Sequence, residues 1–102
     1  MPDWNWDYSL ADAKIMSVEN NDTTLIIKFD CSWTALHPSR YVDQLIFENC
    51  DILEFPNIVG MFWYNAKVSA HGEQFQLCLV VTDRKNHKQT VELGFSSVRY
   101  SK

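Results

Sequence analysis

This chain of 102 residues contains three histidines and three cysteines. These two residue types are the ones that most often bind metals or act as nucleophiles. His37, His71 and His87 stand next to a proline, a glycine and an asparagine, which is typical of turns. None of them has the close spacing of a local ligand pair such as HxxxH. We therefore expect solvated turn histidines, no metal and no cofactor.

The cysteines Cys31, Cys50 and Cys78 are widely spaced, odd in number and free of any CxxC pair. A disulfide framework needs an even number of cysteines, and a zinc site needs ligands that lie close in sequence. We expect reduced, buried thiols that pack as small hydrophobic side chains. No nucleophile elbow or glycine-rich phosphate loop accompanies them, so the sequence favours a binding protein over an enzyme.

The overall charge argues against direct binding to nucleic acid. Thirteen acids against nine bases give a net charge of −4, whereas phosphate binding normally requires an excess of Lys and Arg. A short basic turn is the exception, and we interpret it as a solvated hairpin tip rather than a nucleic-acid site. It contains Arg84, Lys85, His87 and Lys88. A strongly charged partner of this protein would therefore be basic.

The stretch between Arg40 and Lys67 has no Lys or Arg. Its acidic residues are Asp43, Glu48, Asp51 and Glu54. A local negative charge of this kind speeds the encounter with a cationic partner and disfavours wrong partners. These four carboxylates are our candidate partner-binding residues. The alternative is a solvated sheet edge that the charges protect against aggregation.

The aromatic run FWY at residues 62–64 falls in a stretch with a period of two. This alternation places Phe62 and Tyr64 on one face, which we expect to be the core, and Trp63 on the other. Trp63, with Trp33 at the end of another expected strand, is then a candidate anchor for a protein partner. The alternative is that Trp63 packs in a second side of the core, since a domain with two layers needs residues there too.

The same period recurs along nearly the whole chain. Expected strands cover residues 12–19, 23–33, 61–70, 74–83 and 89–101. Residues 39–53 fit a strand or a short helix, and we favour the strand because β-branched and aromatic residues are frequent there. Two hairpins are expected, with turns at ENNDT and at Gly72. In the last strand the apolar positions change parity, which requires a bulge or bend at Ser96 and Ser97.

These elements predict an all-β or β-dominated fold of six to seven strands. We expect a single domain over residues 1–102, with residues 1–9 as a flexible or packing tail, built as an antiparallel β-sandwich or a small, partly open barrel. The longest apolar runs are only strand-sized, and the N-terminus is acidic and aromatic, unlike a secretory signal. We expect a cytoplasmic protein that does not cross a membrane.

One resemblance concerns most of the chain. The succession SLADAKIMSVENNDTTLIIKFD, QLIFENCDILEF and WYNAKV, followed by a closing run of strands, resembles small bacterial β proteins that serve as immunity proteins in polymorphic toxin and contact-dependent growth inhibition systems. That pattern often has a His-Asp pair before the first strand, whereas here Asp12 follows Ala11. The resemblance implies a protein that binds a cognate toxin domain, often a nuclease, one to one, and blocks its active site or substrate path.

The residues are compatible with that function, because a basic nuclease cleft that attracts phosphate also attracts carboxylates. Two alternatives stay open. A small-ligand-binding β-barrel would show the same alternation around a cavity lined by Phe, Leu and Val. A homo-oligomeric assembly subunit, or a weak homodimer, would explain exposed rings.

Overall fold

Seven strands form one antiparallel sheet with the order β6-β5-β4-β1-β2-β3-β7. The computed structural model describes residues 12–33, 43–51 and 55–101. The strands are β1 (Lys14–Asn21), β2 (Thr24–Asp30), β3 (Gln44–Glu48), β4 (Phe62–His71), β5 (Gln74–Thr82), β6 (Lys88–Phe95) and β7 (Ser97–Ser101), with a 3-10 helix η2 (Cys31–Trp33) after β2. The predicted β-dominated fold is confirmed, and the regular element in the described part of 39–53 is a strand.

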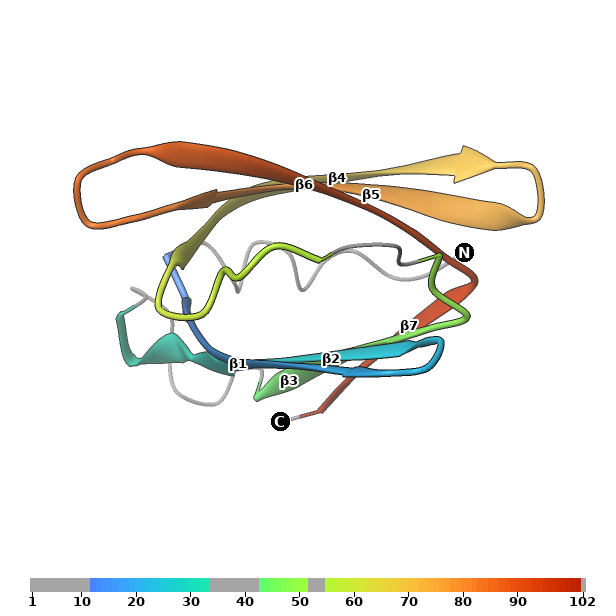
Figure 1. Ribbon diagram of the computed structural model, residues 1–102, viewed down its shortest axis with the longest axis horizontal. Coiled ribbons are helices and arrows are strands. Elements are labelled where there is room, and N and C mark those ends of the chain that lie inside the picture. Colours follow the sequence, from blue (N-terminus) through green and yellow to red (C-terminus); the bar gives the residue numbers. More distant parts are fainter. Residues whose placement is uncertain (1–11, 34–42, 52–54, 102) are drawn as a thin grey trace.

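The sheet folds over into two layers and does not close. Strands β4, β5 and β6 form one layer, and β1, β2, β3 and β7 form the other (Figure 1). The layers are joined where β1 and β4 begin: the Ile15 amide donates to the Met61 carbonyl oxygen at 2.8 Å, and the Trp63 amide donates to the Ala13 carbonyl oxygen at 2.9 Å. Beyond this seam the two strands diverge, which leaves room for a core between the layers.

The second connection between the layers is the bend between β6 and β7. Strand β6 pairs with β5, whereas β7 pairs with β3 in the other layer. The Ser96 amide between them donates to the Glu48 carbonyl oxygen at 2.9 Å. The buried positions change parity across this bend, from Phe95 to the partly buried Val98. The predicted bend is thus confirmed, and its cause is a change of layer.

The core fills the space between the layers. Phe47 of β3 meets Phe95 of β6 edge to face, with ring centroids 5.1 Å apart. Residues 55–61 run between the two layers and bury Ile58 completely (Figure 1). The buried apolar residues are Ala13, Ile15, Leu25, Ile27, Phe29, Cys31, Leu45, Phe47, Cys50, Ile58, Trp63, Leu77, Leu79, Val81, Val91, Leu93 and Phe95.

Trp63 is part of this core, whereas the alternation in the sequence predicts that it lies on the opposite, outer face of its strand. Its side chain is 1% exposed and meets Phe29 edge to face at 5.5 Å, whereas Tyr64 is 51% exposed. The predictions of a buried Tyr64 and of a surface anchor at Trp63 are therefore wrong, and the alternative of a Trp63 that packs in the core is correct. Phe62 is half-buried and is not among the residues of the core.

A β-bulge in β4 explains this difference. Trp63 lies opposite Val81 and Asn65 lies opposite Val80, so Tyr64 is one extra residue between them. A bulge of this kind reverses which side chains point inward. Residues before it bury odd-numbered positions, and residues after it bury even-numbered ones such as Ala66, which packs against the core.

Both predicted hairpins are present. The β1–β2 turn places Asp22 at a φ of 53°, and the β4–β5 turn places Gly72 at a φ of 67°. Glycine adopts this left-handed region without strain, and aspartate tolerates it better than most residues. Both turns lie at the same end of the molecule, on the right in Figure 1.

Candidate protein-binding surface

Strand β3 separates the candidate acidic residues that the sequence groups together. Asp43 immediately precedes β3, and Glu48 is its last residue. Five residues of extended strand span roughly 17 Å, so these two residues lie at opposite ends of β3. Glu54 lies outside the described residues.

Glu48 and Asp51 instead lie next to the β1–β2 turn. The Cys50 amide donates to the Thr23 carbonyl oxygen of that turn at 2.7 Å. The Asp51 amide donates to the Gly94 carbonyl oxygen of β6 at 3.0 Å. These bonds hold residues 49–51 between the two layers and beside the turn that contains Asp22. We call Asp22, Glu48 and Asp51 the acidic end.

Glu48 of the acidic end has a cationic neighbour. Arg99 of β7 pairs in register with Ile46, and its guanidinium forms an ion pair with the Glu48 carboxylate. The Arg99 side chain is 67% exposed and that of Glu48 is 37% exposed, so water screens this pair and its contribution to stability is under about 1 kcal/mol. Three carboxylates against one guanidinium leave two negative charges.

One of the two predicted aromatic anchors is not available to the acidic end. Trp63 is in the core, and the side chain of Trp33 lies outside the described part of the chain. Trp4 and Trp6, with the predicted tail 1–9, are also outside the described residues. Within the described residues, the most exposed large apolar side chains are Met16, Val59 and Tyr64.

Sequence reasoning did not find two residues of this surface. Asp22 had been assigned only to a turn, and Arg99 lies half the chain away from Glu48. The turn-forming composition of ENNDT was the one available signal for Asp22, because Asn and Asp in a tight turn are exposed. No local signal identifies Arg99, since only the pairing of β3 with β7 brings it to Glu48.

The histidines lie in three different parts of the chain. His71 ends β4, His87 lies in the β5–β6 turn, and His37 is outside the described residues. Among residues 12–33, 43–51 and 55–101, no group of three His, Cys, Asp or Glu side chains could hold a metal ion. Within the same residues, no helix has the length and apolar character needed to cross a bilayer.

The thiols differ in their surroundings. Cys31 and Cys50 are buried, whereas Cys78 on β5 is half-buried. Burial raises the pKa of the Cys50 thiol to about 11, and its Sγ donates to the Phe47 carbonyl oxygen at 3.3 Å. A buried thiol with a raised pKa is a poor nucleophile, which fits a packing role.

This difference predicts selective alkylation. At pH 8, iodoacetamide should label Cys78 first in the folded protein and leave Cys31 and Cys50 unmodified until denaturant is added. Peptide mass spectrometry at successive times measures the three rates. The variant C78S is the matched control, and it should take up almost no label while folded. Labelling of Cys50 as fast as that of Cys78 would contradict the buried site.

The β5–β6 turn, residues 83–87, is organised by Asp83. Its Oδ1 accepts hydrogen bonds from the backbone amides of Lys85 at 2.8 Å and His87 at 2.9 Å, and its Oδ2 lies 3.1 Å from His87 Nδ1. The bond from the His87 amide is the main cause of a lowered pKa for the Asp83 carboxyl. The basic turn is therefore a hairpin tip of defined shape.

The lowered pKa of Asp83 predicts the pH at which this turn loosens. Because the pKa is lower in the folded state than in the unfolded state, the carboxylate stabilises the fold above the ordinary aspartate range. This contribution is lost as pH falls through the folded value. In proton–nitrogen NMR spectra the Lys85 and His87 amide resonances should move together on acidification. D83A should abolish this movement, D43A should leave it unchanged, and movement in D83A would contradict the assignment.

No protein-family model, curated protein or solved structure matches this chain. The class of the protein is therefore defined by its own architecture. It is an open, seven-stranded antiparallel sheet, folded into two layers around a hydrophobic core, with the β1–β2 turn at one end and the basic β5–β6 turn at the other (Figure 1).

Proposed function

We propose that this protein is an immunity protein that binds a cognate toxin domain one to one in the cytoplasm and neutralises it. The acidic end covers a basic active site or substrate path, as in a nuclease that attracts phosphate. The protein acts by binding and not by catalysis. The observation that carries the proposal is the pair of backbone hydrogen bonds, Cys50 to Thr23 and Asp51 to Gly94, which hold the segment of Glu48 and Asp51 beside the turn that contains Asp22.

The geometry of the acidic end suits this role. Carboxylate oxygens can occupy the positions of phosphate oxygens and accept charge-assisted hydrogen bonds from Arg and Lys. Backbone hydrogen bonds fix the segments that carry the carboxylates, namely Cys50 to Thr23 and Asp51 to Gly94. A surface that is already ordered loses less conformational entropy on binding, which favours affinity.

The filled core supports a protein-binding function over the alternative of a ligand-binding barrel. Such a barrel needs an internal cavity lined by Phe, Leu and Val, whereas here Phe47, Phe95 and Leu79 are fully buried in the core and the sheet is open. A small ligand would have to bind at the surface. The experiment below distinguishes the proposed function from the remaining alternative, a homo-oligomeric subunit.

Capture of the partner tests the proposal. The tagged protein is recovered from its native cytosol, its tightest partner is identified by mass spectrometry, and the purified pair is titrated at 50 and 500 mM salt. We expect a one-to-one complex with a basic domain, inhibition of that domain's toxic activity, and weaker affinity at high salt because screening reduces the attraction. Recovery of the protein alone or as a homo-oligomer, or a complex that leaves the activity intact, would contradict the proposal.

A further inference from the structure

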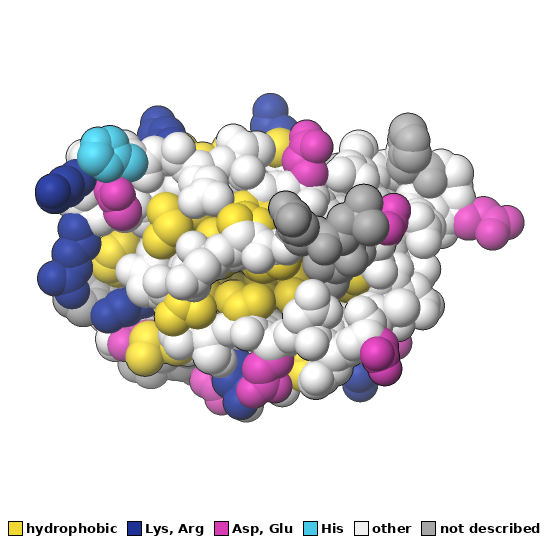
Figure 2. All heavy atoms as spheres, viewed as in Figure 1, with side chains coloured by type: hydrophobic (Ala, Val, Ile, Leu, Met, Phe, Trp, Pro, Cys, Tyr) yellow, Lys and Arg dark blue, Asp and Glu magenta, His cyan; other side chains and the backbone are white. Residues whose placement is uncertain are grey.

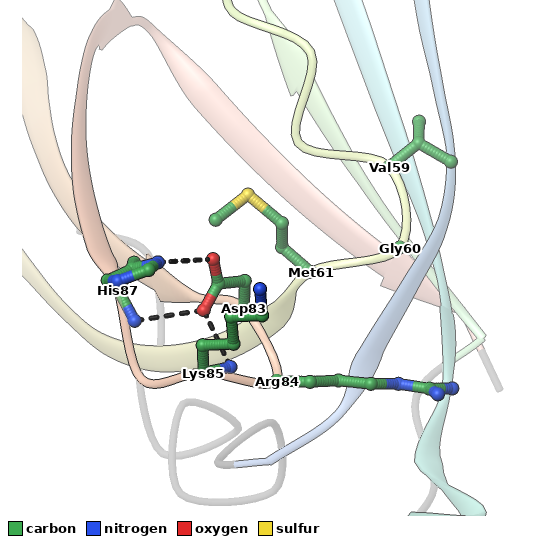
Figure 3. A pocket seen from close by; sticks show the side chains of 7 residues that line it. All are labelled: Val59, Gly60, Met61, Asp83, Arg84, Lys85 and His87. Carbon is green, nitrogen blue, oxygen red and sulfur yellow. Dashed lines mark hydrogen bonds and ion pairs between the residues drawn. The ribbon is translucent and has the colours of Figure 1, made fainter.

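A surface cavity lies at the end of the molecule opposite the acidic end. It occupies about 490 Å³ between the β5–β6 turn and the loop that leads into β4. That volume lies within the range of small-molecule sites. The lining residues are Val59, Gly60, Met61, Asp83, Arg84, Lys85 and His87 (Figure 3).

One side of the cavity is cationic and defined in shape. Arg84 extends from the turn away from His87, so the two side chains lie on opposite sides of Asp83 (Figure 3). Asp83 is the only acid in the lining, and its oxygens already accept bonds from the Lys85 and His87 amides. The turn therefore holds Arg84 and Lys85 on an ordered backbone. The Asp83 carboxylate is already hydrogen-bonded to that backbone.

The other side of the cavity is apolar and open. Val59 is exposed, and Met61 is partly buried with its side chain packed against the core. Gly60 between them has a φ of 88°, and apart from its two chain neighbours no residue has a heavy atom within 4 Å of the position that a Cβ would take. There is consequently free space above Gly60, bordered by one apolar side chain on each side.

We propose that this cavity binds a small amphipathic anion. A phosphate or carboxylate group contacts Arg84 and Lys85, and an apolar portion lies over Val59 and Met61. Guanidinium and ammonium groups donate charge-assisted hydrogen bonds to such anions, and the apolar side adds affinity by burying carbon surface. This site is separate from the acidic end, since the β5–β6 turn lies at the other end of the sheet (Figure 1).

The space-filling view supports the separation. Lys and Arg side chains and a histidine gather at the left end of the molecule, whereas acidic side chains are more frequent toward the right end (Figure 2). An anion is attracted to the left end and repelled by the right end. The two sites therefore favour ligands of opposite charge.

Phenyl phosphate is a suitable probe, with inorganic phosphate and phenol as its two halves. In proton–nitrogen NMR titrations of the full chain, phenyl phosphate should shift the amide resonances of Gly60, Met61, Lys85 and His87 in a saturable way. It should bind more tightly than either half. No saturable shift up to 20 mM, shifts confined to residues far from the cavity, or equal affinity for inorganic phosphate would overturn the proposal.

Two pairs of variants test the two sides of the site. R84Q/K85Q removes the cations and should weaken binding at least about tenfold, whereas K67Q on the face of β4 should not. V59E adds a negative charge beside the apolar side and should weaken binding, whereas V59Q, of the same length but uncharged, should weaken it less. Equal affinity of R84Q/K85Q and the unmodified protein would refute the assignment. Because Arg84, Lys85 and Val59 are exposed, folding should be retained, and thermal unfolding checks this.

Discussion

Replacement of Trp63 by alanine is expected to lower the free energy of unfolding by about 3–5 kcal/mol, the range for truncation of a buried Trp or Phe. Trp63 is 1% exposed, contacts Phe29 at 5.5 Å, and lies beside the seam that joins the two layers. The change removes a large buried surface and leaves a cavity that the seam cannot close. Urea denaturation followed by far-UV circular dichroism measures the loss.

Tyr64 is the matched control because it is the next residue in the chain. It is 51% exposed, and its ring contacts the Lys88 ammonium at 4.5 Å. Y64A should cost at most about 1 kcal/mol, the value of an exposed cation–π contact. If W63A is too unstable to fold, W63F can be measured instead. Because it retains an aromatic ring, its loss of unfolding free energy should lie between those of W63A and Y64A. A larger loss for Y64A than for the Trp63 variants would contradict the bulge in β4.

The second large effect concerns the affinity for the proposed toxin partner. D22N/D51K should weaken binding by 2–4 kcal/mol, or roughly 30- to 1,000-fold, because lost attraction and a new repulsion act on the same desolvated contact. Asparagine is chosen at position 22 because it tolerates the φ of 53° found there. Calorimetric titration at constant salt measures the change, and thermal unfolding of the free variant checks its fold.

The comparison of D51K with D43K localises the contact. Both substitutions change the charge by two units on an exposed residue of the same acidic stretch, but Asp51 belongs to the acidic end and Asp43 lies at the far end of β3. We expect D51K to lower the affinity strongly and D43K to lower it only slightly, through long-range attraction. Equal effects would mean that net charge, and not this surface, determines binding.

The period of two was sufficient to predict the burial of whole strands. Leu25 and Ile27 on β2, and Val91 and Leu93 on β6, are buried as the alternation predicts. These strands have regular pairing, so each inward position follows from the previous one. The same logic located the bend at Ser96, where the parity of the apolar residues changes.

The alternation predicted the wrong buried face at the start of β4, because a β-bulge there reverses which side chains point inward and the apolar pattern continues through it. Residues 61–64 are apolar on both faces of the strand, so the alternation of apolar and polar residues gave no sign of which face is buried there. The extra residue between Trp63 and Asn65 was therefore not detectable from the pattern. Burial of Trp63 follows only from the register against β5. A polar residue at position 62 or 64 would have made the correct face evident.

Prediction of the acidic surface was limited by contacts between distant parts of the chain. Glu48 and Asp51 are three residues apart in the sequence, so local spacing alone keeps their backbones near each other. Asp43 is also close to Glu48 in sequence, but an extended strand carries it away. Asp22 and Arg99 reach the same end only through the pairing of β2 and β7 with β3.

Hydrogen–deuterium exchange of the protein, free and bound to its captured partner, tests the central proposal most directly. We predict that binding protects the backbone amides of residues 20–24 and 48–51, which carry the acidic end, and leaves the β5–β6 turn unchanged. Peptides from D22N/D51K should show much less protection at the same partner concentration. Protection confined to the β5–β6 turn or to the edge strands β6 and β7, with none at residues 20–24 and 48–51, would contradict recognition through the acidic end.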